Sequence, residues 1–208
     1  MPEFNLKLLC TTDLHMELIG YDYLTDQPIP NRGLLRLAPE IAKERQNATS
    51  LLFDNGDFLQ GTPLADELAN SESHVLADAF NALDYDAITL GNHDFDYGLQ
   101  SLNGFLAQLN CPVVSSNATG LGPAVHDHVI LDRVLIGDAG EKRNIRIGVI
   151  GLLPPQTTSW NAHCLKQSVH IEDMVEAAKA ASNKAHENGA NLVIALAHTG
   201  LDNAPPTQ

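Results

Sequence analysis

The 208-residue chain is poor in cysteine and in basic residues. Its three cysteines, Cys10, Cys111 and Cys164, are odd in number and lack metal-type spacing, so the sequence predicts neither a disulfide framework nor a cysteine metal site. Lysine and arginine total 12 against 26 aspartates and glutamates, which gives a formal net charge of −14. Because nucleic acid polymers and anionic membranes attract basic surfaces, this composition argues against both as partners.

Long hydrophobic runs are also absent, and no secretory leader is visible in the sequence. No stretch approaches the roughly 18 apolar residues that mark a transmembrane helix. The longest apolar runs, at residues 145–153 and 192–197, have the length of strands. Near Met1 there is neither a cationic start nor a small-residue cleavage site. We therefore expect either a cytoplasmic protein or one whose leader has been removed.

Short apolar runs alternate with helical periodicities, which is typical of an α/β fold. The sequence predicts strands at 6–11, 51–53, 86–90, 112–115 and 192–197, helices at 34–41, 73–83 and 99–109, and a hairpin of 125–136 with 145–153 around a turn at 137–141. A further helix is predicted from one apolar face, Ile171, Met174, Val175, Ala178 and Ala181, and ends at Gly189. With no repeat and no linker, residues 1–208 are predicted to form one domain.

Four of the predicted strands are followed by side chains that can bind a metal ion. They are Asp13 with His15, Asp57, Asn92 with His93, and His198. Ligands of open α/β sheets bind at the carboxyl ends of strands, so we expect these side chains to share one site. Each motif alone has a plain structural explanation, as a turn or a helix cap, but together they require four coincidences.

Each motif has a physical interpretation. Asp13 and His15 are two residues apart, so in an extended segment both would point to the same side and hold one ion. Gly56 lets the backbone pass close to the site, so the carboxylate of Asp57 could bridge two ions. Asn92 offers a neutral amide oxygen. Carboxylate oxygens and imidazole nitrogens suit Zn²⁺, Mn²⁺ or Fe.

His93 is expected to act on the substrate, because it follows Asn92 directly and should point elsewhere. Asp96, three residues later, could orient the imidazole and stabilise its protonated form. The other histidines carry less support: His126 and His128 are predicted to be surface residues. A surface or capping role is also expected for His74, His163, His170 and His186.

The motifs Asp-x-His, Gly-Asp, Gly-Asn-His-Asp and a strand ending in histidine resemble those of the calcineurin-like metallophosphoesterase superfamily. The surrounding residues 11–15, 54–66 and 90–99 are similar to the 5′-nucleotidase branch, above all to bacterial 2′,3′-cyclic-nucleotide 2′-phosphodiesterase/3′-nucleotidases. Residues 21–23, 151–156, 160 and 197–201 add to a match that covers nearly the whole chain.

The resemblance implies a four-layer αββα domain that holds two divalent metal ions, Mn, Zn, Fe or Co. One ion would be bound by Asp13, His15 and Asp57, the other by Asp57, Asn92 and His198, with His93 and Asp96 as the catalytic dyad. A metal-bridging hydroxide would attack the phosphorus of 2′,3′-cyclic nucleotides and 3′-nucleotides. Relatives of this type are usually exported, which implies a periplasmic or other extracytoplasmic location.

Two departures from the family keep alternatives open. Some cyclic-phosphodiesterase relatives carry asparagine at the position of Asp96 whereas 5′-nucleotidases carry aspartate, so a 5′-nucleotidase or a related UDP-sugar or nucleotide hydrolase is the alternative. The family also has a later Gly-His-x-His motif and a C-terminal domain that holds the nucleoside base. This chain ends at Gln208, ten residues after His198, so we expect a domain that is incomplete at its C-terminus.

Three rival functions remain open. The first is a metal-binding fragment without catalytic activity. The second is a hydrolase that uses Asp13 as a nucleophile with a single Mg²⁺. The third, a Rossmann-type nucleotide-binding protein, is disfavoured because no Gly-x-Gly-x-x-Gly follows a predicted strand.

Overall fold

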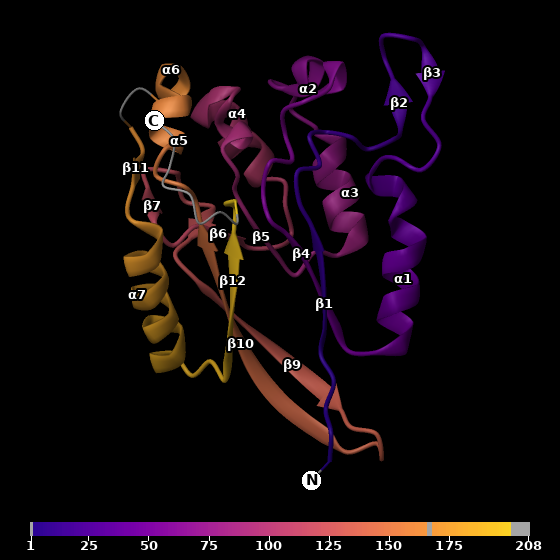
Figure 1. Ribbon diagram of the computed structural model, residues 1–208, viewed down its shortest axis with the longest axis vertical. Helices are drawn as coiled ribbons and strands as arrows, with labels where there is room; N and C mark the ends of the chain where they lie inside the picture. The colour runs from indigo at the N-terminus through magenta and orange to yellow at the C-terminus, as the bar shows by residue number, and fades with distance from the viewer. Residues whose placement is uncertain (1, 166–167, 201–208) are drawn as a thin grey trace.

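Two β-sheets lie face to face in the computed structural model, which describes residues 2–165 and 168–200 (Figure 1). The first sheet is parallel and has the order β1 (Lys7–Thr11), β4 (Ser50–Asp54), β5 (Ala87–Thr89), β6 (Val113–Val114) and β8 (Val125–His126). The second has the order β12 (Leu192–Ala197), β10 (Lys142–Leu152) and β9 (Val129–Ile136). In it, β10 runs parallel to β12 and antiparallel to β9.

The core between the sheets follows from the alternation of side chains along each strand. Leu51 and Phe53 of β4 point toward the second sheet and pack in one cluster with Val149 of β10 and Leu196 of β12. Leu52, between them, points the other way into a second cluster. Because both faces of β4 are covered, its sequence is a continuous apolar run rather than an alternating one.

Helices cover the outer face of each sheet. The first sheet is covered by α1 (Ala38–Asn47), α3 (Val75–Leu83) and α4 (Gly98–Leu106), whose buried side chains join Leu52 in the outer cluster. The second sheet is covered by α7 (Met174–Glu187), which approaches so closely that a Cβ on Gly148 would lie 2.8 Å from the Cβ of Ala185. This arrangement confirms the predicted four-layer αββα fold (Figure 1).

Short elements connect these layers. They are β2 (Tyr21–Asp22) paired with β3 (Gln27–Pro28), η1 (Leu34–Arg36), α2 (Pro63–Leu68), η2 (His93–Phe95), β7 (Ala118–Thr119) paired with β11 (His170–Ile171), α5 (Thr157–Trp160) and α6 (Ala162–Leu165). Within residues 2–165 and 168–200, no helix is long and apolar enough to cross a membrane. The predicted match at residue 201 lies outside the described residues.

The predicted hairpin is confirmed, but its first strand is shorter than expected. Residues 125–136 form two strands in different sheets, because β8 pairs with β6 whereas β9 pairs with β10. The chain crosses between the sheets at Asp127, whose carbonyl accepts a hydrogen bond from the hydroxyl of Ser116. The apolar run is interrupted at Asp127 and His128, and its two parts therefore belong to different sheets.

The predicted apolar face of the last helix is confirmed at Ala181 but was wrong at Ile171 and Val175. Asp173 caps α7 by accepting hydrogen bonds from two backbone N–H groups, including that of Val175, so Ile171 lies outside the helix in β11. Val175 falls in the first turn and is 60% exposed. The buried face is made of alanines four residues apart: Ala177, Ala181 and Ala185. The predicted end at Gly189 is confirmed, because this glycine has a φ of 89° and donates to the carbonyl of His186.

Candidate metal centre

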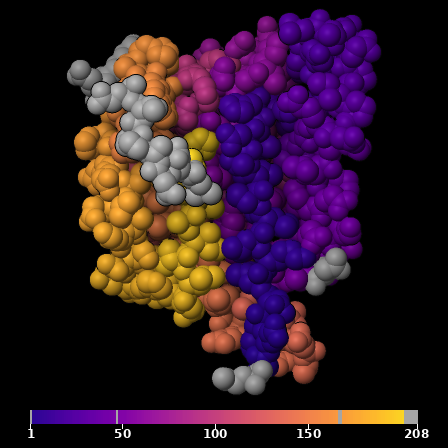
Figure 2. Space-filling model, viewed as in Figure 1, coloured from indigo at the N-terminus to yellow at the C-terminus, as the bar shows by residue number. Residues whose placement is uncertain are grey.

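The ends of β1, β4, β5 and β12 meet at one place, as the sequence predicts. Figure 2 shows that the N-terminal segment, in indigo, lies beside the yellow segment that contains β12. The side-chain amide of Asn55 joins the two sheets by donating to the carbonyl of Ala197 over 3.1 Å. The loops after β4 and β5 are in backbone contact, because a Cβ on Gly56 would lie 2.3 Å from the nitrogen of Gly91. Glycine at both positions is therefore required for the strand ends to meet.

Asp13, His15 and Asp57 do not lie in extended segments. Their φ angles are 52°, 46° and 60°, in the left-handed region that residues other than glycine rarely adopt. The loop after β1 is held there by backbone hydrogen bonds of 2.9 Å, from Asp13 N–H to the carbonyl of Gly56 and from His15 N–H to that of Asp57. The expectation of an extended Asp13–His15 pair was therefore wrong. Such strained backbone costs on the order of 1 kcal/mol per residue and clusters at functional sites.

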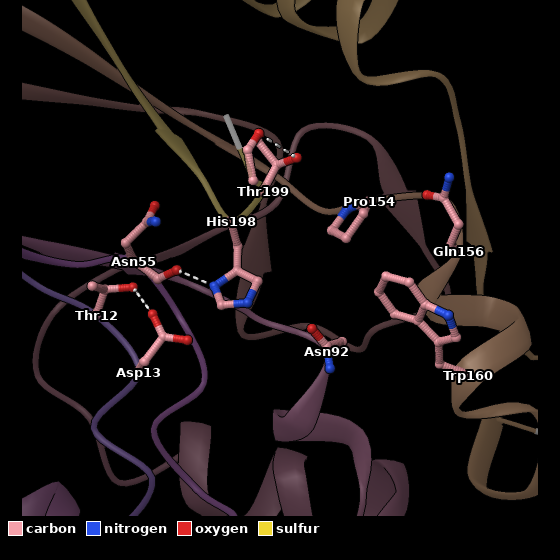
Figure 3. A pocket seen from close by; sticks show the side chains of 10 residues that line it. Thr12, Asp13, Asn55, Asn92, Pro154, Gln156, Trp160, His198 and Thr199 are labelled. Atoms are coloured by element: carbon pink, nitrogen blue, oxygen red, sulfur yellow. Dashed lines mark hydrogen bonds between the residues drawn. The ribbon is translucent and has the colours of Figure 1, made fainter. Parts of the chain in front are cut away.

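Three of the predicted metal ligands lie close together in space. Asp13, Asp57 and His198 each offer one ligand atom within 4.8 Å of the others. His15 adds its Nε2 at 4.0 Å from Oδ1 of Asp13. Asn92 lines the same pocket as Asp13 and His198 (Figure 3). Asp57 is almost fully buried whereas the side chain of Asp13 is half exposed, so the cluster has one buried and one open side.

The hydrogen bonds of two histidines fix which nitrogen is available to a metal. Nδ1 of His15 lies 2.6 Å from the carbonyl of Gln60, and Nδ1 of His198 lies 2.8 Å from that of Asn55. Because a carbonyl can only accept, Nδ1 carries a proton in both rings, which leaves Nε2 as the nitrogen that can bind an ion once it is deprotonated. Metal-binding histidines usually have this arrangement, with the other ring nitrogen donating to a carbonyl or carboxylate.

His198 and Asp57 face each other with Nε2 and Oδ2 3.2 Å apart. Burial lowers the pKa of His198, but its hydrogen bond with Asp57 and the negative charge there outweigh burial and raise the pKa to about 9. Burial also opposes ionisation of Asp57, yet His198 and His93 together lower the pKa of that carboxyl. A positive charge next to the Asp57 carboxylate therefore stabilises this pair, and either a proton on His198 or a divalent cation can supply it. The donor set of carboxylates, imidazoles and an amide fits a borderline metal such as Zn²⁺ or Mn²⁺.

His93 and Asp96 form the hydrogen-bonded pair that the sequence predicts. Nδ1 of His93 donates to Oδ2 of Asp96 over 2.8 Å, and the backbone N–H of His93 donates to Oδ1 of Asp57 over 2.7 Å. The imidazole is 43% exposed and its ring centroid lies 5.3 Å from that of His15. Burial lowers the pKa of His93, but the hydrogen bond with Asp96 and the charge of Asp57 outweigh it, so the pKa is raised.

Asp94 was included in the motif but given no role by sequence reasoning. Its buried carboxylate accepts four backbone N–H groups, from Asp57, Phe58, Leu59 and Gly91, over 2.8 to 3.0 Å. It thereby holds the loop after β4 against the loop after β5. Asp94 positions the backbone of Asp57 rather than facing the pocket.

Asn161 was missed entirely by sequence reasoning. Its side chain is 3% exposed, and its Nδ2 donates to Oδ1 of Asp96 over 2.6 Å, on the opposite oxygen from His93. The residue follows α5, so a segment 65 residues away in the sequence fixes the orientation of Asp96. No motif marks this asparagine, because only the tertiary fold brings it to the dyad.

Two of the remaining histidines do not lie on the surface. His126 is exposed as predicted, but the imidazole of His128 is 9% exposed and hydrogen-bonds to Asp127 and Asn188 where α7 ends. His74 is 5% exposed, and burial lowers its pKa. It stands before α3 without capping it through its side chain.

A buried carboxyl group beneath the site links stability to pH. Asp54 accepts hydrogen bonds from Thr11 Oγ1 (2.6 Å) and Gly56 N–H (2.9 Å), and Thr11 also contacts the hydroxyl of Tyr85. Burial raises the pKa of Asp54 to about 8. Because its pKa is raised on folding, the stability that Asp54 contributes is present below about pH 4 and is lost as pH rises to 8.

We expect Asp54→Asn to change this pH dependence. The amide can replace the protonated carboxyl, accepting from Gly56 and donating to Thr11, and it does not ionise. The free energy of unfolding of the variant relative to wild type should therefore increase between pH 4 and pH 8, by at most about 1.4 kcal/mol per pH unit. Urea unfolding of both proteins at pH 5 and pH 8 measures this difference. A constant difference across this range would show that Asp54 is ionised throughout.

The candidate ligands open into a pocket of about 520 Å³. It is lined by residues of both sheets and of the α5 segment: Thr12, Asp13, Asn55, Asn92, Pro154, Gln156, Trp160, His198, Thr199 and Gly200 (Figure 3). This volume is within the range of small-molecule sites. Thr12, Asp13 and Asn55 lie on one side of it, whereas Pro154, Gln156 and Trp160 lie on the other.

Comparison with known proteins identifies the family. Residues 6–207 match the sequence profile described as calcineurin-like phosphoesterase. This chain belongs to the calcineurin-like phosphoesterase family. The family consists of metal-dependent hydrolases, which agrees with the cluster of candidate ligands at the strand ends.

Named relatives of this phosphoesterase domain are nucleotide hydrolases. It is 39% identical to the 2′,3′-cyclic-nucleotide 2′-phosphodiesterase/3′-nucleotidase of Yersinia enterocolitica, over 97% of this chain and 32% of that protein. It is 38% identical to the trifunctional nucleotide phosphoesterase protein YfkN of Bacillus subtilis, over 97% of this chain and 15% of that protein. The crystal structure of the calcineurin-like phosphoesterase YfkN from the same organism superposes with a TM-score of 0.90 at 36% identity, over 99% of this chain and 65% of the other. The phosphoesterase domain thus spans at most about a third of these two curated relatives.

Proposed function

We propose that this domain hydrolyses phosphate esters of nucleotides, with 2′,3′-cyclic nucleotides and 3′-nucleotides as its first substrates. The observation that carries the proposal is the cluster of Asp13, Asp57 and His198 within 4.8 Å, beside the hydrogen-bonded pair His93–Asp96. The substrate class rests on the name of the Yersinia relative. An extracytoplasmic location and a separate nucleotide-binding domain in the full-length protein belong to the same proposal, with a cytoplasmic location as the alternative.

The proposed ligand sets are Asp13, His15 and Asp57 for one divalent ion, and Asp57, Asn92 and His198 for another. When bound, such ions would lower the pKa of water to supply a nucleophile at neutral pH and would offset the negative charge of the phosphate. Two divalent ions would carry four positive charges, and the ligands Asp13 and Asp57 contribute only two negative charges. The site can therefore attract a phosphate despite a net charge of −14 over the chain.

His93 is proposed to donate a proton from Nε2 to a phosphate oxygen or to the leaving alkoxide. Asp96 holds the ring through Nδ1, so Nε2 is the nitrogen left to face the substrate. Asp96 also stabilises the protonated ring, in agreement with the raised pKa of His93. The backbone N–H of His93 binds Asp57, which ties the position of the acid to that of the proposed bridging carboxylate.

Product analysis with three nucleotides tests the proposed function. The chain is incubated with 2′,3′-cyclic AMP, 3′-AMP or 5′-AMP and Mn²⁺, and products are separated by chromatography. We expect conversion of the first two, abolished by chelator and restored by added metal. Selective hydrolysis of 5′-AMP would instead support the 5′-nucleotidase alternative, which Asp96 favours. Metal binding without turnover of any substrate would identify the metal-binding fragment without activity.

Asn161 is expected to matter through Asp96. Removing its amide in Asn161→Ala leaves Oδ1 of Asp96 without this hydrogen bond, so His93 is held less firmly. We expect kcat for 3′-AMP to fall about 10-fold, with a smaller fall for p-nitrophenyl phosphate, whose leaving group needs no proton. The matched control is Asn144→Ala, an exposed asparagine of β10. Equal losses with both substrates would mean that Asn161 serves the fold alone.

A further inference from the structure

Trp160 is the single tryptophan of the chain and is 57% exposed. It ends α5 and lines the same pocket as Asn92 and His198 (Figure 3). A tryptophan is usually buried over most of its surface, because its ring is large and apolar. An indole that remains open to a polar pocket therefore needs an explanation.

The backbone that carries Trp160 is fixed on both sides. Thr157, one turn earlier, is fully buried, and the N–H of Trp160 donates to the carbonyl of Gln156 over 2.9 Å. The next residue, Asn161, is buried and bound to Asp96 of the dyad. The backbone of Trp160 is thus held at a set position relative to His93 and Asp96. Only the two side-chain torsions of the indole remain to be ordered when it stacks on a ligand, so the entropic cost is low.

The two sides of the pocket differ in chemistry. Figure 3 shows Thr12, Asp13 and Asn55 on one side, and Pro154, Gln156 and Trp160 on the other, with Asn92 and His198 between them. The first side carries candidate metal ligands, and so suits a phosphate. The second offers the aromatic ring of Trp160 and the apolar ring of Pro154 beside one amide, Gln156, and so suits the ring of a base attached to that phosphate through ribose.

We propose that Trp160 is a stacking platform for the nucleobase of the substrate. This inference rests on the proposed function and adds a binding determinant within this chain, where sequence reasoning expected the base to be held only by a separate C-terminal domain. A base has two faces, so Trp160 can bind one while another domain covers the other. Because every base has a π-face, the platform distinguishes nucleotides from base-free sugar phosphates but does not select one base.

Kinetics with a matched pair of substrates tests the proposal. The quantity measured is the ratio of kcat/KM for 3′-AMP to kcat/KM for ribose 3-phosphate, which share the ester and differ in the base. We expect Trp160→Ala to lower this ratio about 10-fold, and Trp160→Phe to restore most of it. Ile136→Ala, which removes a similarly exposed apolar side chain at the far end of β9, should leave the ratio at its wild-type value. An unchanged ratio in an active Trp160→Ala enzyme would overturn the platform.

Tryptophan fluorescence gives a second readout that needs no catalysis. Since Trp160 is the single tryptophan, its emission reports directly on this position. In chelator, adenosine should quench the emission to a plateau, whereas ribose should not. N-acetyl-tryptophanamide at the same adenosine concentrations corrects for collisional quenching. Quenching that rises linearly and matches this free compound would overturn the proposal even if the chain proves to be an active phosphoesterase. Saturable quenching by adenosine in a chain without turnover would support the platform while the proposed function fails.

Discussion

Asp57→Asn is expected to lower metal-dependent hydrolysis of 3′-AMP by at least about 100-fold. In the proposed site Asp57 would be a ligand in both sets, so the substitution would weaken both at once. Asp57 also lies at the centre of the cluster, with Oδ2 3.2 Å from Nε2 of His198 and Oδ1 accepting from His93 N–H. Initial rates over a range of Mn²⁺ concentrations measure the effect.

The fold is expected to tolerate this substitution. An asparagine amide can accept from His93 through its oxygen and donate through its nitrogen to Nε2 of His198, which carries a lone pair when Nδ1–H donates to Asn55. Circular dichroism and thermal unfolding in chelator should therefore resemble those of wild type. The matched control is Asp138→Asn, an exposed aspartate in the turn between β9 and β10. Full activity of Asp57→Asn would contradict the proposed ligand role.

His93→Asn is expected to reduce kcat for 3′-AMP by about 10²–10⁴-fold while metal affinity stays within a few-fold of wild type. The shorter amide keeps a donor near Asp96 but presents no group at the position of Nε2. Because p-nitrophenol leaves without a proton, the loss with p-nitrophenyl phosphate should be smaller. Steady-state rates with both substrates measure this difference. A fall in metal affinity that accounts for the whole loss of rate would instead make His93 a ligand.

A double-mutant cycle connects His93 with Asn161. If Asn161 acts only by holding Asp96 for His93, then Asn161→Ala should have little further effect in the His93→Asn background. Multiplicative losses would show that the two residues act independently. The cycle separates a positioning role from a general effect of Asn161 on the α5 segment.

Sequence reasoning found the strand ends because the signal there is local. An apolar run followed by Asp57, or by Asn92 and His93, is visible in the sequence, and parallel strands bring their carboxyl ends together. The four-layer fold followed from the resemblance to known phosphoesterases, and the structure confirms it. The roles of the site residues remain predictions.

What sequence reasoning missed depends on contacts between distant residues or on backbone conformation. The left-handed φ angles of Asp13 and His15 arise from hydrogen bonds to the loop after β4, which no spacing rule reports. Asn161 reaches Asp96 across 65 residues. The exposed face of α7 at Val175 was misjudged because the cap at Asp173 sets where the helix begins, and apolar spacing alone does not.

Metal stoichiometry is the most direct test of the central claim that these strand ends form a two-metal centre. Isothermal titration of the metal-free chain with Mn²⁺ or Zn²⁺ should give two ions per chain for wild type and for Asp138→Asn, and weaker binding with fewer ions for Asp57→Asn. Absence of saturable binding, or binding by Asp57→Asn equal to that of wild type, would contradict a centre built on Asp57.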